Sequence, residues 1–438
     1  MRSPAQPQSI NEGYPSRGYA WTVVAILVAT AVLSYTDRQV LSLLVDPIRH
    51  DLGISDTEIS LLLGTAFAFV YGIAGIPLGY LADRTSRRNL IFAGVLVWSL
   101  GTVACGFSRS FGEIFTSRLA VGLGEAVLSP AAISLISDYF PASRRGTAVG
   151  FFLSGIAVGV GASILIGGGV LQAVEHGALA GTALGAQAPW RLVLTLIGVA
   201  GLFWAPTILL IREPIRGKTD DDVSQSVAGA RAWRRSAWGR VVPIYVVLAV
   251  ASLADNAVGA WAPTLLIREF SRDAAQVGVQ LGLLLTVGYG GGVLMGGWLA
   301  DRAGGQGGKW RKLRVCLYSA LLILPVSFLM DVNNFTLVLT AVPLYFALSG
   351  IVTAAGFSAI LDVVPNNSRG LTMAISFFLN VALGAGLGPT AVAVASDHLF
   401  GGAGLGPAIS LTVVLGYLLV IAALSLSLTI FRRREHVP

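Results

Sequence analysis

Long apolar segments follow one another along almost the whole chain, and short groups of charged residues, prolines and glycines separate them. A helix rises about 1.5 Å per residue, so roughly 20 apolar residues cross a hydrocarbon core of about 30 Å. Twelve segments have this length and character. We expect membrane-spanning helices at residues 20–46, 57–81, 89–107, 112–139, 147–173, 190–211, 241–268, 275–300, 312–331, 335–363, 370–396 and 407–431. The pattern predicts an all-α polytopic membrane protein.

One long polar stretch in the middle of the chain divides the twelve predicted helices into two groups of six. The polar N-terminus is rich in Pro, Ser and Gln, a composition typical of disorder. We predict a disordered cytosolic N-tail at 1–19, a six-helix bundle at 20–211, a cytosolic linker at 212–240, a second six-helix bundle at 241–431 and a cytosolic C-tail at 432–438.

Composition and charge agree with a membrane protein. Hydrophobic residues make up 54% of the chain and charged residues 12%, about half the charged share of a soluble domain. If both termini are cytoplasmic, most of the 30 Lys and Arg residues lie on the cytoplasmic side, and only Arg49, Arg109, Arg268 and Arg272 lie in external loops. This asymmetry follows the positive-inside rule, so the net charge of +7 requires no nucleic-acid partner. We expect a plasma, or inner, membrane location.

The second half of the chain repeats motifs of the first half. The motif at 79–84, Gly-Tyr-Leu-Ala-Asp-Arg, returns at 297–302 as Gly-Trp-Leu-Ala-Asp-Arg. An aspartate precedes the aspartate of each motif by 46 residues, and these two are Asp37 and Asp255. A further repeat relates Asp138, Pro141, Arg145 and Gly146 to Asp362, Pro365, Arg369 and Gly370. The chain is therefore predicted to be a duplicated six-helix unit with parallel repeats.

Three motifs resemble those of the major facilitator superfamily. Residues 79–88 resemble its cytoplasmic signature G-x-L-x-D-R-x-G-R-R and depart from it only at Ser86. Residues 118–124 resemble its fourth-helix motif. The glycines from Gly155 to Gly161 resemble its glycine-rich fifth helix, which we expect to pack against the eighth. The resemblance implies a secondary transporter that works by alternating access.

A finer resemblance concerns helices one and four. Tyr35-Thr-Asp-Arg38 together with Gly122-Leu-Gly-Glu-Ala126 resembles the spinster branch, whose members carry lysophospholipids and sphingosine phosphate. Organic-anion and sugar-acid carriers of the same superfamily also place a Tyr, an Asp and an Arg near this part of helix one. The sequence therefore supports two substrate classes: lysolipid-like or sphingolipid-like amphiphiles, and small organic anions or drugs.

Four charged residues are predicted to lie inside the membrane in the first half. Asp37 and Arg38 interrupt helix one, and Arg118 and Glu125 are seven residues apart, hence on one face of helix four. Charge facing lipid is costly, so we expect the four to form one cluster. Small changes in pairing can move the pKa of a carboxylate in such a cluster across physiological pH. This favours proton coupling, and Glu125 is the stronger candidate. The alternative is a pair of salt bridges that only pins the two helices.

The signature loop predicts a cytoplasmic gate. In the superfamily its aspartate, here Asp83, faces the start of helix eleven and basic residues after helix four, and an anion stabilises a helix N-terminus. Asp138 and Asp362 are predicted to anchor loops locally. The alternative is that the arginines only fix topology. The predicted gate residues are Gly79, Asp83, Arg84, Arg87, Arg88, Arg144 and Arg145.

Helices one, four, seven and ten line the cavity in this superfamily. Mild polar side chains there stand among apolar residues, which suits an amphiphile with an anionic head. The predicted cavity residues are Tyr35, Ser129, Asp255, Asn256, Trp261, Tyr345, Ser349 and Thr353, with Asn380 of helix eleven as an addition.

Other functional classes lack sequence support. No G-x-x-x-x-G-K-[ST] loop is present, so ATP-driven pumping is not expected. No HExxH or GxSxG motif is present, and we predict no catalytic residue, metal site or cofactor. The expected partners are the amphiphile, protons and membrane lipids, for a monomeric protein. A receptor without transport activity remains an alternative.

Overall fold

The computed structural model describes residues 15–178, 181–182, 185–214, 227–305, 310–364, 369–401 and 404–435. Most of the predicted N-tail, the centre of the predicted linker and the last three residues of the predicted C-tail lie outside these ranges. The described residues are almost entirely helical.

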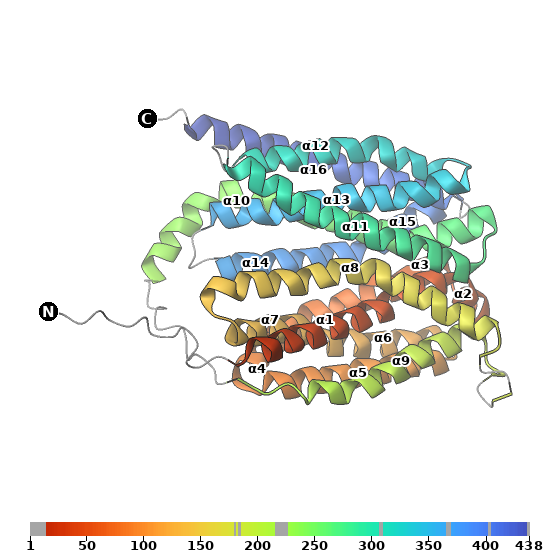
Figure 1. Ribbon diagram of the computed structural model, residues 1–438. Helices are drawn as coiled ribbons and strands as arrows, with labels where there is room; N and C mark the ends of the chain where they lie inside the picture. The colour runs from red at the N-terminus through yellow and green to blue at the C-terminus, as the bar shows by residue number, and fades with distance from the viewer. Residues whose placement is uncertain are drawn as a thin grey trace.

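The first half of the chain forms a bundle that begins and ends on the same side (Figure 1). Its elements are α1 (Arg17–Val40), η1 (Leu41–Leu43), α2 (Val45–Leu52), α3 (Asp56–Ser60), η2 (Leu61–Thr65), α4 (Ala66–Arg84), α5 (Arg87–Phe107), α6 (Phe111–Glu125), α7 (Leu128–Tyr139), α8 (Ala142–Glu175) and α9 (Pro189–Ile208).

The second half forms a bundle stacked against the first (Figure 1). Its elements are α10 (Val227–Phe270), α11 (Ala274–Gly305), α12 (Arg311–Phe328), η3 (Leu329–Asp331), α13 (Phe335–Val363), α14 (Arg369–Leu379), η5 (Asn380–Ala385), α15 (Gly386–Leu399) and α16 (Leu405–Glu435). We call the end of the molecule that bears both termini the terminal end, and the other end the opposite end.

Eleven helical stretches of the described chain are long and apolar enough to cross a membrane. They correspond to eleven of the twelve predicted helices, which confirms an all-α polytopic architecture. The remaining predicted helix, 370–396, is divided into α14, the π-helical turn η5 and α15. Pro389 explains the division, because it has no N–H for the carbonyl of Ala385 and its ring crowds that carbonyl.

The predicted linker is helical in its second part. Helix α10 begins at Val227, within the predicted linker 212–240, and continues into the seventh crossing. Ala and Arg dominate residues 228–235, and both have high helix propensity.

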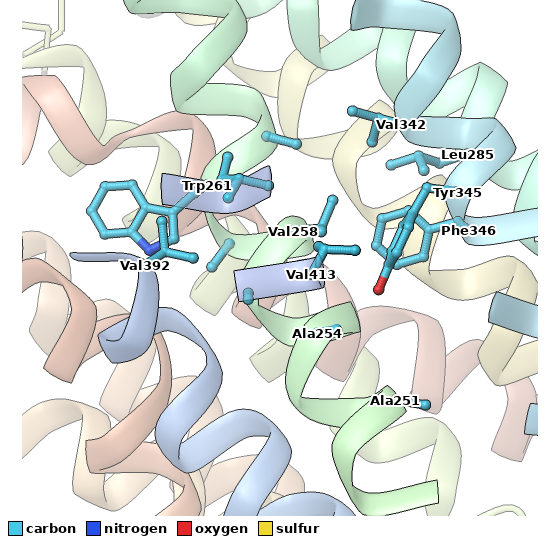
Figure 2. Packing of buried hydrophobic residues seen from close by; sticks show 14 of the residues in the cluster. Ala251, Ala254, Val258, Trp261, Leu285, Val342, Tyr345, Phe346, Val392 and Val413 are labelled. Carbon is cyan, nitrogen blue, oxygen red and sulfur yellow. The ribbon is translucent and has the colours of Figure 1, made fainter. Parts of the chain in front are cut away.

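An apolar core fills each half. Figure 2 shows part of the second half, where Trp261 of α10 lies beside Val392 of α15, and Val258 of α10 lies near Val413 of α16 and faces Tyr345 of α13. Alanines of α10 let these helices approach closely. This packing fixes the middle of α10, where Asp255 lies.

The two halves meet along α8 and α11 through glycines. A Cβ at Gly168 would lie 2.8 Å from the Cα of Gly278, and a Cβ at Gly282 would lie 2.7 Å from the Cα of Leu165. Gly161 faces Thr286 of α11 in the same way, as predicted for the fifth helix. Gly155 instead packs against Val28 of α1, within the first half.

We expect Gly168→Val to separate α8 from α11, because the added side chain has no space and overpacking costs about 1–3 kcal/mol. The measurement is the thermal unfolding midpoint of the purified protein, which should fall by several degrees. The matched control is Gly169→Val, because a Cβ at Gly169 meets nothing within 4 Å. Equal midpoints for the two variants would contradict the close packing.

Candidate functional site

The structure brings the four predicted membrane charges of the first half together as two ion pairs. Arg38 of α1 binds Glu125, the last residue of α6, through Nε and Oε2 at 2.5 Å. Arg118 of α6 binds Asp37 of α1 through Nη1 and Oδ1 at 3.3 Å. Each helix thus contributes one acid and one base, and both pairs join α1 to α6.

Hydroxyl groups complete the contacts of the two carboxylates. Ser34 donates a hydrogen bond to Oε2 of Glu125 at 2.7 Å. Thr102 of α5 donates to Oδ2 of Asp37. The cluster therefore holds three elements of the first half together, with two acids and two bases in balance.

Three of the four charges are withdrawn from solvent, and one is not. Asp37, Arg118 and Glu125 are at most 2% exposed, whereas the Arg38 side chain is 22% exposed. The Arg38 guanidinium carbon lies 4.0 Å from the ring centre of Phe67 and 4.8 Å from that of Tyr35. Arg38 is therefore the least buried of the four charges.

The cluster is not fully satisfied by the described residues. Buried Nε and Nη2 of Arg118 and Oε1 of Glu125 have no hydrogen-bond partner there. Unpaired buried polar atoms are costly, so this arrangement is only moderately favoured over other pairings of the same four side chains.

The second half holds one half-buried acid at the repeated position. Asp255 of α10 accepts hydrogen bonds from Tyr345 at 2.9 Å and from Ser349 at 2.6 Å, both on α13. Tyr417 of α16 donates to the Ser349 hydroxyl at 3.1 Å. Figure 2 shows Tyr345 directed toward α10 near Ala254.

The other predicted cavity residues have different environments. Tyr35, Ser129, Thr353 and Asn380 are half-buried. The amide of Asn256 donates to the carbonyl of Ser252 one helical turn earlier, at 2.8 Å.

Trp261 differs from the expectation that it lines a cavity. Its side chain is fully buried, and its Nε1 donates to the carbonyl of Pro389 at 2.8 Å. Trp261 is buried because its indole ring fills the space between α10 and α15 and donates its N–H to the carbonyl of Pro389 there.

The predicted gate residue Arg87 lies within one half instead of bridging two. Its buried guanidinium binds Asp138 at 2.5 Å and Glu213 at 2.8 Å, and Nη1 also donates to the Ser134 hydroxyl at 3.0 Å. Arg87, Ser134 and Asp138 belong to the first bundle, and Glu213 follows its last helix, α9, at the start of the predicted linker. Asp138 is thus a local anchor, as predicted, while sequence analysis did not single out Ser134 or Glu213.

The second half repeats this anchor with a lysine. Lys312 binds Asp362 at 2.6 Å and the Ser358 hydroxyl at 2.9 Å. Ser134 and Ser358 both precede the repeated aspartate by four residues. This shared spacing is the signal that could have identified both anchors from the sequence.

The remaining predicted gate residues make fewer contacts. Arg84 is exposed and lies 4.1 Å from the ring centre of Tyr80, Arg88 binds its neighbour Asn89, and Arg144 is exposed. A Cβ at Gly79 would meet nothing within 4 Å. The side chains of Asp83 and Arg145 lie outside the described part of the chain, so their predicted gate contact stays a prediction.

Charged contacts between the halves gather at the opposite end. Arg268, the last basic residue of α10, binds Asp46 at 2.7 Å and both carboxylate oxygens of Asp56 at 2.7 and 2.8 Å. Arg49 also binds Asp56, at 3.1 Å. Sequence analysis counted Arg268 only as an external-loop charge, because its partners are more than 200 residues away.

Polar contacts between α15 and the segment from α3 to η2 close the same end. Thr57 donates to Asp397 at 2.7 Å, and Thr65 donates to the carbonyl of Gly386 at 2.8 Å. Thr264 of α10 donates to the carbonyl of Ser42 at 3.1 Å. The opposite end is therefore sealed by side chains from both halves.

We expect Arg87→Ala to lower the free energy of unfolding by about 2–4 kcal/mol, because two acids lose their buried partner. Thermal unfolding of the purified protein measures this. Arg84→Ala is the control, since Arg84 is exposed and should change stability by less than about 0.5 kcal/mol. Similar midpoints for the two variants would contradict the anchor.

The Glu213 contacts predict a pH dependence. Burial raises the pKa of Glu213, but hydrogen bonds from the Arg88 amide and from the Arg87 and Ser86 side chains outweigh it and hold the pKa below 4.5. Because the folded-state pKa is depressed, the stabilisation is complete above about pH 4.5 and lost as pH falls through the lower value. The difference in unfolding midpoint between wild type and Glu213→Gln should therefore be present at pH 7 and shrink toward pH 3. A difference independent of pH would contradict the ion pair.

The sequence model of the Major Facilitator Superfamily matches residues 27–389. The match covers most of the chain, and the chain belongs to this superfamily. Its members are transporters rather than enzymes, and the predicted twelve-helix, two-bundle fold is confirmed.

Individual relatives cover nearly the whole chain. An MFS-type efflux pump of Mycolicibacterium smegmatis is 28% identical over 407 residues, which are 90% of this chain and 89% of the pump. A D-galactonate transporter of Escherichia coli is 25% identical over 428 residues, 91% and 93% of the two chains. The crystal structure of a bacterial homologue of the human lysosomal transporter Spinster, inward-facing and unoccupied, has a TM-score of 0.82 at 22% identity, covering 95% of this chain and 98% of that one. This last likeness confirms the predicted spinster-like fold.

Proposed function

We propose that this protein is a proton-coupled secondary transporter of an amphiphile with an anionic head. The observation that carries the proposal is the cluster of Asp37, Arg38, Arg118 and Glu125: two acids and two bases, three of them withdrawn from solvent and one partly exposed. A charge inside the membrane is retained at considerable cost, which points to a functional role.

The proposed coupling is an exchange of ion-pair partners. Protonation of Glu125 removes its charge and releases Arg38, which is then free to bind an anion. Loss of that proton restores the Arg38–Glu125 pair and displaces the anion. Asp37 holds Arg118 beside the cluster, so a change at either acid redistributes the pairs and biases the two states of the transporter.

The closed opposite end supports an alternating-access cycle. With both termini assigned to the cytoplasm, the Arg268 contacts join the two halves on the external side, as an inward-facing state requires. Opening that side requires Arg268 to leave Asp46 and Asp56. The gate at this side is therefore an ion-pair cluster contributed by both halves.

The amphiphile proposal rests on the surroundings of Arg38. Phe67, Tyr35 and Tyr71 surround its guanidinium with aromatic rings, the farthest ring centre at 5.7 Å. Aromatic and apolar walls with a single partly exposed cation suit a molecule with an anionic head and an apolar body. The resemblance of residues 35–38 and 122–126 to the spinster branch supports the same class.

A second candidate is transport of small organic anions such as sugar acids. It is favoured by the D-galactonate transporter that aligns over 91% of the chain. Flux of lysophosphatidate and of D-galactonate into proteoliposomes, with and without a pH gradient, separates the two. Gradient-dependent flux of galactonate alone would replace the amphiphile proposal.

We expect Glu125→Gln and Asp37→Asn to abolish the dependence of transport on an imposed pH gradient, because neither amide titrates. Substrate exchange without a gradient should persist in at least one variant. The control is Glu58→Gln, which keeps the helix-capping geometry of that position outside the cluster. Transport that depends on the pH gradient as in wild type, in both cluster variants, would contradict the coupling proposal.

We expect Arg268→Gln to open the opposite end, because it loses three charge-assisted contacts. Spin labels at positions 50 and 399, exposed residues of the two halves at that end, report the separation. The distance distribution should gain a longer component in the variant. A distribution identical to that of wild type would show that Arg268 does not hold this end closed.

A further inference from the structure

Asp255 is an acid near the middle of the membrane without a basic partner. It lies close to the centre of the Val241–Phe270 crossing. Both of its hydrogen bonds, from Tyr345 and Ser349, end on Oδ1. Among the described residues, it forms no salt bridge and Oδ2 has no hydrogen-bond partner. In the first half the equivalent acid, Asp37, has Arg118.

The internal repeat explains the missing cation. The offset of 224 residues that relates Asp138 to Asp362 also relates Glu125 to Ser349 and Arg118 to Val342. Val342 is fully buried and has no charge to offer. The second half thus keeps the acid of the duplicated site, as Asp255, but has the apolar Val342 where the first half has Arg118.

Asp255 is less deeply buried than the residues that bind it. It is half-buried, whereas its two hydrogen-bond partners on α13 are fully buried. Tyr289 of α11, also half-buried, lies within electrostatic range of both Asp255 and Tyr35. Tyr35 in turn contacts Arg38. Tyr289 therefore lies near both Asp255 and the Tyr35–Arg38 contact of the first half.

Tyr345, which binds Asp255, and Tyr289 each pack against another aromatic ring. Tyr345 packs edge-on against Tyr417 with ring centres 6.1 Å apart, and Tyr289 packs edge-on against Phe346 at 5.5 Å. Aromatic rings beside a carboxylate attract cationic nitrogen, through the negative ring face and the full charge together.

We propose that Asp255 binds a cationic nitrogen of the transported molecule, with Tyr289 beside it and with Tyr345 and Ser349 as positioning residues. The inference deepens the proposed function and rests on it for the anionic end: Arg38 receives the anionic group, and Asp255 receives an ammonium group. The substrate then carries both charges. Its cation takes the place that Arg118 occupies beside Asp37 in the first half.

The test compares ligands that differ only in that charge. The probes are lysophosphatidylethanolamine and 2-amino-2-deoxygluconate, each paired with its N-acetylated form, which lacks the cation. Dissociation constants are measured by calorimetry on the purified full-length protein at pH 7. For at least one pair, wild type should bind the free amine about tenfold more tightly, and Asp255→Asn should reduce this preference to less than about twofold.

Two further variants keep the result interpretable. Asp273→Asn removes an acid outside the bundle while keeping a helix-capping side chain, and it should retain the preference. Ser349→Ala removes one hydrogen bond to Asp255 but leaves its charge, so the loss of a positioning residue should reduce the preference less than Asp255→Asn does. Loss of the preference in Ser349→Ala to the extent seen in Asp255→Asn would assign the effect to packing and overturn the inference.

The outcomes separate this inference from the proposed function. No binding of any amine probe, equal binding within both pairs, or a preference that survives Asp255→Asn overturns the cation site, even where lysophosphatidate is transported with protons. A preference confined to the sugar-acid pair and lost in Asp255→Asn supports the cation site and removes the amphiphile as substrate.

Discussion

The cost of placing charge inside a membrane governs this structure. Asp37, Arg38, Arg118 and Glu125 can remain in the first bundle only because each acid meets a base on the neighbouring helix. The pairs cross between α1 and α6, so neither helix can move alone without separating charges. The same requirement sets the position of the surrounding hydroxyls and leaves Arg38 as the least buried member.

Duplication produced two halves that solve this problem differently. Asp138 and Asp362 have equivalent surroundings: in each half a basic side chain binds the aspartate and a serine hydroxyl. Asp37 and Asp255 have different surroundings, because Asp37 binds a basic side chain and Asp255 binds only hydroxyl groups. The conserved pairs lie toward the terminal end and hold helices together, whereas the divergent pair lies in the interior. Symmetry is thus retained at the anchors and lost in the interior, where the proposed binding site lies.

Sequence patterns predicted the helices and the first-half cluster because both depend on strong local signals. The length of an apolar segment identifies a membrane crossing. A charged residue within such a segment is costly unless it has a partner. The Arg268 contacts were missed because Asp46 and Asp56 belong to a distant part of the chain and look like ordinary loop acids. Arg87 was assigned to the gate between halves, yet Glu213, whose position in space the sequence does not show, keeps it within one. Trp261 was placed in a cavity because helix position alone does not distinguish a lining residue from one that seals a junction.

The two π-helical turns make the seams between the bundles mechanically unequal. Along α8 and α11 the backbones lie in direct contact through glycine, and both helices are continuous. Across the other seam, η2 faces η5, and Gly64 leaves space for the ring of Pro389. A π turn has a locally irregular hydrogen-bond ladder and bends more readily than an α-helix. Any bending of helices between the bundles is therefore expected at η2 and η5 rather than along the continuous α8 and α11.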